Sequence, residues 1–138
     1  MEDKKSLLQT KKCCYICGTT QDLHYHHIFY GTANRKKSDE DLMGVYLCGP
    51  HHNLSNAGVH FNKALDEKLK KQAEKIWIRT YCKGDNWEAG IEKFIRRYGR
   101  NYLDDKDIET VKRTSFEINR RLEKTILYLE SELEHNSD

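Results

Sequence analysis

The stretches Cys14-Tyr-Ile-Cys17 and Cys48-Gly-Pro-His51 decide how this sequence folds. In each stretch, two residues lie between two metal-binding side chains, and 30 residues separate one stretch from the other. A gap of two residues lets a tight turn point both donors at one ion, so two such turns supply a tetrahedron of three thiolates and one imidazole. A zinc ion with four protein ligands is closed to substrate and stabilises a fold. The spacing therefore predicts a structural zinc ion; the alternative is that the three cysteines are small core residues.

The composition describes a chain that needs such support. Its 138 residues are enough for one domain, or for a small domain with an appendage, and its mean hydropathy of −0.90 implies a modest core. No apolar run approaches the roughly 18 residues of a membrane span, and no apolar stretch follows the polar N-terminus as in a secretory signal. We therefore expect a cytoplasmic protein with no membrane partner, whose five cysteines and seven histidines bind metal instead of forming disulfides.

The texture of the sequence predicts an α+β fold in three parts. Residues 1–12 are expected to form a mobile polar arm, residues 13–83 a zinc-containing core, and residues 84–138 a helical extension. The spacing of apolar residues predicts strands at 23–30 and 45–47, with a long polar loop at 31–44 between them. It also predicts three helices, at about 60–82, about 85–99 and about 105–133. Asp85 and Glu88 resemble a capping box at the start of the second helix.

Charge is distributed unevenly along the chain. The net charge is only +2, but residues 63–103 carry 11 Lys/Arg against 6 Asp/Glu, and residues 104–138 carry 6 against 10. The basic middle is equally compatible with nucleic-acid binding and with a solvated helix face. The acidic last helix is expected to pack against the domain or against a second copy of the chain, which would make a homodimer.

Histidines left over from the zinc site can build a second site. Five of them lie between residues 24 and 60: His24, His26, His27, His52 and His60. A strand with two adjacent histidines, facing a helix start with two more, can surround one cation and one attacking water. His24 is expected to pack or to hydrogen bond instead, because strand alternation places it one step further from this group.

The order of these motifs resembles the HNH endonuclease superfamily, and in particular the small HNH proteins encoded in phages and prophages. The resemblance covers residues 13 to about 100 and rests on the two Cys/His stretches, Leu23-His-Tyr-His-His-Ile28, Asn34-Arg-Lys-Lys-Ser38, His52-Asn53, and Gly58-Val-His-Phe-Asn62. It implies a ββα-metal core of treble-clef type, held by the structural zinc ion and followed by two or three helical segments.

The resemblance also implies a role for each histidine of the second site. His27 matches the general base, His26 the metal ligand just before it, and His52 and His60 the ligands on the helix side. Many relatives have an asparagine backing the base shortly before the second knuckle, where this chain reads Met-Gly-Val-Tyr. We therefore expect a backbone carbonyl or Asn53 to orient His27.

The implied activity is that of a metal-dependent DNA endonuclease that nicks or cuts, leaving 5′-phosphate and 3′-hydroxyl ends in a bacterial or phage-infected host cell. A neutral imidazole is a suitable base near neutral pH. Imidazole ligands suit Mn²⁺, Ni²⁺ or Zn²⁺ better than Mg²⁺. Phosphate contacts are expected from basic residues in the long loop and on the predicted helix at about 60–82: Arg35, Lys36, Lys37, Lys68, Lys71, Lys75 and Arg79.

Two alternatives remain open at this point. The chain can be a non-catalytic zinc module that binds nucleic acid or a protein, with His26, His27 and His52 holding a second structural zinc. It can also be an accessory to recombination or packaging that depends on a phage-encoded partner. The basic side chains named above can equally serve solubility.

Overall fold

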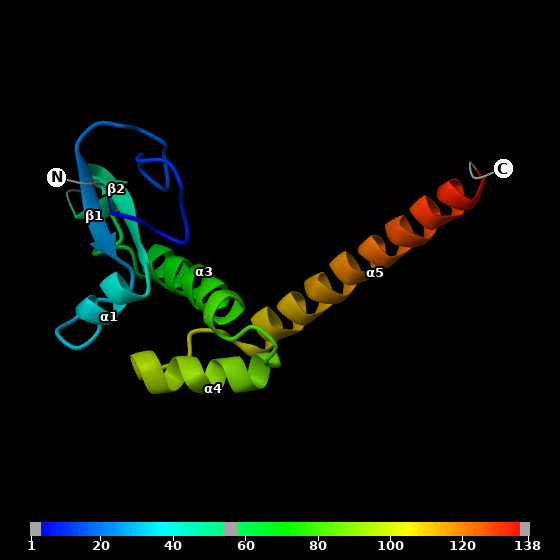
Figure 1. The fold of residues 1–138 in the computed structure, drawn as a ribbon. Coiled ribbons are helices and arrows are strands. Elements are labelled where there is room, and N and C mark those ends of the chain that lie inside the picture. The colour runs from blue at the N-terminus through cyan, green and yellow to red at the C-terminus, as the bar shows by residue number, and fades with distance from the viewer. Residues whose placement is uncertain (1–3, 54–57, 136–138) are drawn as a thin grey trace. The chain divides into compact units, whose positions relative to one another are not determined.

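The computed structural model describes residues 4–53 and 58–135. For residues 114–123 and 134–135, which lie in the last helix, it describes the backbone only. The elements follow the order β1 (Leu23–His27), α1 (Arg35–Glu40), β2 (Gly44–Cys48), α2 (Gly49–His52), α3 (Lys63–Tyr81), α4 (Trp87–Tyr98) and α5 (Asp105–His135) (Figure 1). The chain divides into two compact units, Met1–Tyr102 and Leu103–Asp138. The predicted α+β class is confirmed, and none of the described helices is long and apolar enough to cross a membrane.

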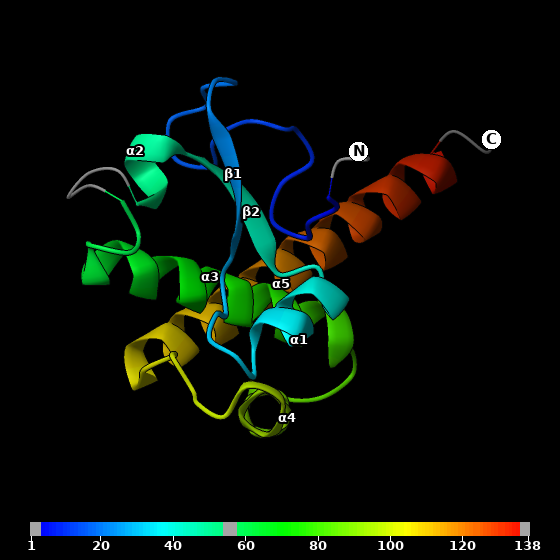
Figure 2. The same ribbon diagram turned by 90° about the vertical axis from the view of Figure 1, so that its left-hand side faces the viewer.

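A two-stranded antiparallel sheet positions the histidines. Leu23 lies opposite Cys48, and His27 lies opposite Gly44. Because side chains alternate along a strand, His24 and His26 share one face of β1 while Tyr25 and His27 share the other. Connectivity places α1 at one end of the sheet and α2 at the other, as Figure 2 shows.

The N-terminal segment follows β2. The amide of Leu7 donates to the carbonyl of Leu42 at 3.0 Å, and the amide of Tyr15 donates to the carbonyl of Tyr46 at 2.9 Å. The side chain of Gln9 accepts a hydrogen bond from the amide of Tyr46. These bonds satisfy backbone groups that an edge strand otherwise exposes.

The prediction of a loop over residues 31–44 is wrong, because α1 forms within it. Ser38 anchors this short helix: it is fully buried, and its hydroxyl donates to the carbonyl of Phe29 at 2.6 Å. Six polar residues offer too little periodicity to show a helix in the sequence. Arg35, Lys36 and Lys37 therefore lie on a helix and not in a loop.

The helix α4 belongs to the same unit as the two strands and the Cys14/Cys17/Cys48/His51 cluster, whereas the sequence placed the boundary at residue 84. The ring of Phe94 lies 5.2 Å from that of Phe29 and 5.5 Å from that of Trp77. Gly90 allows α4 to approach α3 closely, since a Cβ there would lie 2.5 Å from Ile78. Asn86 caps this helix, since its side chain accepts a hydrogen bond from the amide of Ala89; the cap lies one residue after the predicted cap at Asp85.

Asp41, just after α1, ties this helix to α3 and α4. Its carboxylate accepts hydrogen bonds from Trp77 Nε1 at 2.8 Å, from Tyr98 Oη at 2.7 Å and from the guanidinium of Arg97 at 2.9–3.0 Å. Burial alone would raise the pKa of Asp41, but these donors hold it below its usual value. The interaction also engages Arg97, which pairs with Glu40 as well.

The unit formed by α5 begins with reciprocal capping. The amide of Asp107 donates to the Asp104 side chain at 2.8 Å, and the amide of Asp104 donates to the Asp107 side chain at 3.0 Å. The predicted helix of about 105–133 is confirmed. Toward its end the helix exposes large apolar side chains: Ile126, Leu127, Tyr128, Leu129 and Leu133.

Replacing Asp41 by asparagine is expected to destabilise the first unit by about 2 kcal/mol, because a charged acceptor of several buried donors is lost. The folded-state pKa of Asp41 is depressed, so this contribution is fully present above the usual aspartate pKa of about 4 and is lost as the pH falls below it. Urea unfolding at pH 7 and at pH 3.5 measures both effects. Glu40→Gln is the matched control, because this half-exposed carboxylate binds the same arginine and should change stability by less than about 0.5 kcal/mol.

Candidate metal centres

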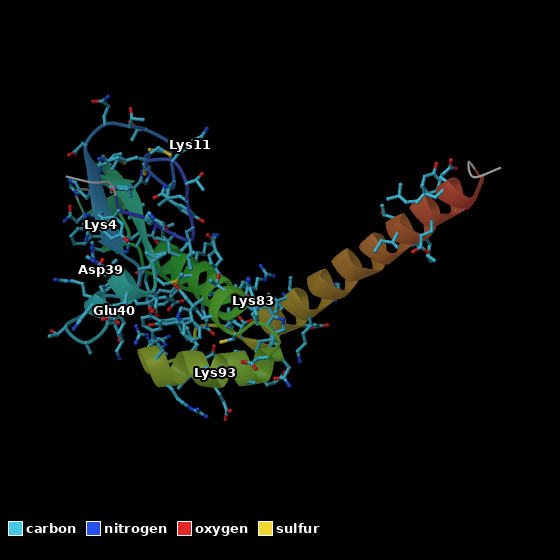
Figure 3. The ribbon with its side chains drawn as sticks, viewed as in Figure 1. Lys4, Lys11, Asp39, Glu40, Lys83 and Lys93 are labelled. Carbon is cyan, nitrogen blue, oxygen red and sulfur yellow. The ribbon has the colours of Figure 1, made fainter. Side chains whose placement is uncertain are left out.

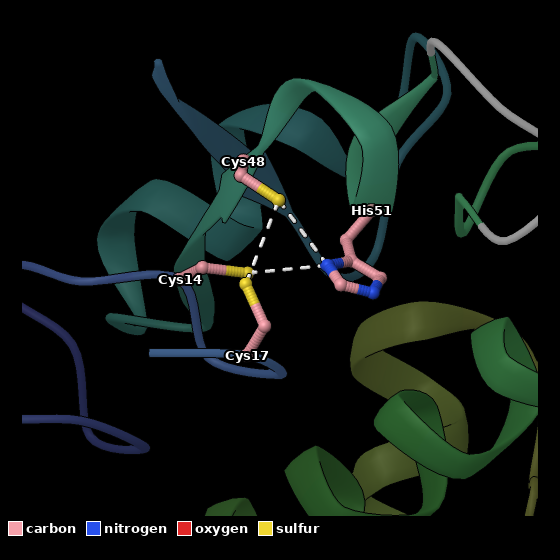
Figure 4. A group of neighbouring side chains, drawn as sticks. All are labelled: Cys14, Cys17, Cys48 and His51. Carbon is pink, nitrogen blue, oxygen red and sulfur yellow. Dashed lines mark hydrogen bonds between the residues drawn. The ribbon is translucent and has the colours of Figure 1, made fainter. Parts of the chain in front are cut away.

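Four metal-binding side chains lie close together where the turn at Cys14–Cys17, the N-terminal knuckle, contacts the end of β2. Cys48 ends β2 and His51 lies in α2, while Cys14 and Cys17 come from a turn in which the amide of Gly18 donates to the carbonyl of Cys14. Gly18 has a φ of +78°, which glycine adopts at no steric cost. Figure 4 shows the three sulfur atoms and the His51 ring pointing toward one another.

The distances within this cluster fit one tetrahedral ion. Cys17 Sγ lies 3.8 Å from Cys48 Sγ, and His51 Nδ1 lies 3.8 Å from Cys14 Sγ and 3.2 Å from Cys48 Sγ. Two Zn–S bonds of about 2.3 Å at a tetrahedral angle put their sulfur atoms about 3.8 Å apart, whereas a disulfide needs about 2.05 Å. The predicted convergence of these four residues is confirmed, and the cluster can bind a metal such as zinc.

Backbone amides prepare one of the sulfurs for binding. Burial would raise the pKa of Cys14, but hydrogen bonds from the backbone of Cys17, Cys48 and Ile16 lower it to about 6. Burial raises the pKa of Cys48. Because metal binds the thiolate, the cluster contains one sulfur that is already ionised near neutral pH and one that loses its proton when the metal arrives.

A second group of donors consists of His26, His52 and His60, whose ligating nitrogens lie within 4.8 Å of one another. Nε2 of His52 and Nε2 of His60 are 3.0 Å apart. Two ligands at right angles with bonds of about 2.1 Å have the same separation. The buried Nε2 of His26 has no hydrogen-bond partner among the described residues, and a cation at this point would satisfy it.

The chain returns to α2 to bring His60 beside His52. The amide of Val59 donates to the carbonyl of His51, and the amide of His60 donates to the carbonyl of His52. Gly58 makes this approach possible, since a Cβ there would lie 2.7 Å from the His52 carbonyl oxygen. His60 was expected at the start of the long helix; the structure places it in the turn before α3.

Burial favours the neutral form of two of these histidines, His26 and His52. Burial, with a smaller contribution from the neighbouring imidazoles, lowers the pKa of His26 to about 3 and that of His52 to about 4. Neutral imidazole is the form that binds a metal, so these two ligands need not lose a proton near pH 7. The group opens into a cavity of about 240 Å³ lined by Tyr25, His26, His27, Tyr30, Arg35, His52 and His60.

His27 borders this cavity but is not one of the three clustered nitrogens. Its Nε2 lies 2.9 Å from Oδ1 of Asp39, on α1. The sequence suggested Asn53 or a backbone carbonyl for this place, whereas the structure puts Asn53 exposed at the end of α2. Asp39 was missed because it lies in the stretch interpreted as a loop.

His24 is a hydrogen-bonding partner of His52, on the side of the His52 ring away from the cluster. Its Nδ1 lies 3.1 Å from Nδ1 of His52, and its Nε2 lies 3.3 Å from a carboxylate oxygen of Asp22. Asp22 has a φ of +51°, an uncommon value for a residue other than glycine. Such a carboxylate–imidazole chain fixes the tautomer of a ligand and directs its other nitrogen, here Nε2, toward the cluster.

The structure separates the predicted phosphate-binding residues. Arg35 lines the cavity of the second group. Lys37 donates to the carbonyl of Arg97 at 2.8 Å, and Arg79 lies over the ring of Trp87. The remaining members of the predicted set lie on α1 and α3: Lys36, Lys68, Lys71 and Lys75.

Cys17→Ser is expected to reduce tightly bound zinc from one equivalent to a small fraction and to lower the melting temperature, because three donors hold the ion much less tightly than four. Metal content by mass spectrometry and thermal unfolding measure these effects. Cys13→Ser is the control, since Cys13 precedes the knuckle but lies outside the four-donor cluster. Equal zinc loss in both variants would contradict the assignment.

His24→Ala is expected to weaken binding of Ni²⁺ at the histidine group by about 10- to 100-fold, the usual cost of losing a residue that orients a metal ligand. Calorimetric titration of the zinc-loaded protein provides the measurement, and unchanged zinc content shows that the cysteine site is intact. Unchanged Ni²⁺ affinity would rule out an orienting role for His24.

Comparison with protein-family models, with curated proteins and with solved structures found no match to this chain. The two donor clusters and the residues around them are therefore the features of the molecule that indicate its function.

Proposed function

We propose that this chain is a metal-dependent endonuclease of the HNH type that hydrolyses phosphodiester bonds in DNA. One observation carries the proposal: His26, His52 and His60 converge on an open cavity that His27 borders with a carboxylate behind it. Three imidazoles leave coordination positions for substrate and water, which a saturated structural site does not. The resemblance of the motif order to that of HNH nucleases also supports this assignment.

The two ions would have different tasks. Cys14, Cys17, Cys48 and His51 would hold a structural zinc ion that joins the knuckle to the sheet. His26, His52 and His60 would hold a divalent ion that supplies Lewis-acid stabilisation to the scissile phosphate and to the departing oxygen. Mn²⁺ or Ni²⁺ suits this imidazole set better than Mg²⁺ does.

Three residues near the cavity, His27, Asp39 and Arg35, would carry out the other steps of the hydrolysis. His27 takes a proton from the attacking water; since its Nε2 is hydrogen bonded to Asp39, Nδ1 is the nitrogen left to accept that proton. Asp39 orients the ring and stabilises the imidazolium that forms. Arg35, on the cavity wall, offsets charge on the phosphate. Oxygen of the deprotonated water bonds to phosphorus as the bond from phosphorus to the 3′-oxygen breaks, and the departing oxygen takes a proton from solvent water, which gives a 5′-phosphate and a 3′-hydroxyl.

A second candidate is an interaction module without catalysis. The exposed apolar side chains near the end of α5, Leu129 and Leu133 among them, favour a protein surface as partner, either a second copy of the chain or a phage-encoded protein. Such a module would bind without cutting, so the variant below separates the two candidates.

His27→Ala is expected to lower plasmid cleavage by about 100-fold or more, because the water loses its base. Cleavage by the unaltered protein should be faster with Mn²⁺ or Ni²⁺ than with Mg²⁺. Asp39→Asn should lower the rate less than His27→Ala does, while Asn53→Ala, the matched control, should leave it near the starting value. Gel assays of supercoiled plasmid give the rates. Absence of cutting with every ion, by a folded protein that binds DNA, would favour the interaction module.

A further inference from the structure

A second cavity, of about 380 Å³, lies between the N-terminal segment and β2. Four of its nine lining residues are lysines and none is acidic: Lys4, Lys5, Ser6, Gln9, Thr10, Lys11, Lys12, Leu42 and Tyr46. All four lysines are exposed. The predicted phosphate contacts from α1 and α3 do not include them.

The backbone that carries these lysines is held in place. The amide of Lys4 donates to the hydroxyl of Tyr46 at 2.9 Å. The side-chain amide of Gln9 donates to the carbonyls of Lys11 and Cys13 at 3.1 and 3.0 Å. The backbone of both basic stretches that line this hollow, residues 4–5 and 11–12, is thereby held by hydrogen bonds, although their ammonium groups remain on flexible stems.

The charge of this cavity favours an anion with several negative groups. The four lysines that line this hollow carry like charges, of which that of Lys4 pairs with Asp39, and a polyanion offsets this excess of positive charge while releasing counterions. The hydroxyls of Ser6 and Thr10 are further donors suited to phosphate oxygens. Contacts of these types fix a nucleic-acid backbone without reading its sequence.

The cavity adjoins the proposed catalytic group through one side chain. Lys4 Nζ lies 3.5 Å from Oδ1 of Asp39, the same oxygen that lies 2.9 Å from Nε2 of His27. Lys4 also lies over the ring of Tyr25, 4.6 Å from its centre, and Tyr25 lines the histidine cavity. A strand passing His27 can therefore continue over the N-terminal lysines.

We propose that this lysine-lined cavity binds the phosphodiester backbone of the nucleic acid that flanks the cut site. The inference rests on the proposed function for its substrate, but it concerns binding and can be tested without cleavage. It makes the N-terminal segment part of the substrate-binding surface.

The test compares two double variants in a His27→Ala background, so that the DNA stays whole. Lys5→Gln/Lys11→Gln removes two charges from the cavity and spares Lys4, which contacts Asp39. Lys83→Gln/Lys93→Gln, the matched control, removes two exposed charges at and beyond the α3–α4 turn, away from Lys4 and Lys11 in Figure 3. Fluorescence anisotropy with a labelled 30-base-pair duplex is recorded over a range of salt concentrations.

The cavity pair is expected to lose about 10-fold or more in DNA affinity and to reduce the slope of log K against log salt by about 2, since each phosphate contact contributes about 0.9. The control pair should change both quantities much less. Equal affinities for the two pairs would overturn the proposal. Titration with inorganic phosphate covers the other source of this chemistry: phosphate binding that the cavity pair abolishes, with unchanged DNA affinity, would also overturn it.

The two proposals fail in different ways. Selective loss of DNA binding in the cavity pair, together with no cutting by the unaltered protein, would support the binding surface and reject the nuclease. Cutting by the unaltered protein, together with equal binding by both pairs, would support the nuclease and reject the cavity.

Discussion

The convergence of three sulfurs and one imidazole is the constraint on which the rest of the first unit depends. The sheet has only two strands, and a pair of strands alone is marginally stable in water. Cys48 and His51 stand at the junction of β2 and α2, while the partner cysteines come from a turn more than thirty residues earlier. A shared ion there would join segments that local structure cannot hold together.

A second junction, without metal, holds the other end of the sheet. Asp41 accepts hydrogen bonds from α3 and α4, and Ser38 anchors α1 against the strand that precedes it. The aromatic core formed by Phe29 and Phe94 fills the space between these elements. The sheet is therefore stabilised at both ends, by the cysteine–histidine cluster at one end and by the carboxylate of Asp41 at the other. The histidine cavity is formed by residues of this sheet and of the segments around it.

The sequence was informative where residue chemistry and short spacing carry the signal. The pairing of Cys14 with Cys17 and of Cys48 with His51 can be read without coordinates, because a two-residue gap has few other uses. It was uninformative where a contact depends on tertiary packing. Asp39 reaches His27 only because a six-residue helix forms in a polar stretch, and no local pattern marks that helix.

Adjacent residues, His51 and His52, belong to different donor clusters, and this has a thermodynamic consequence. One peptide bond joins them, so the two candidate centres share one short stretch of backbone. If an ion at one centre changes the affinity of the other, the linkage is reciprocal: each centre changes the binding at the other by the same factor.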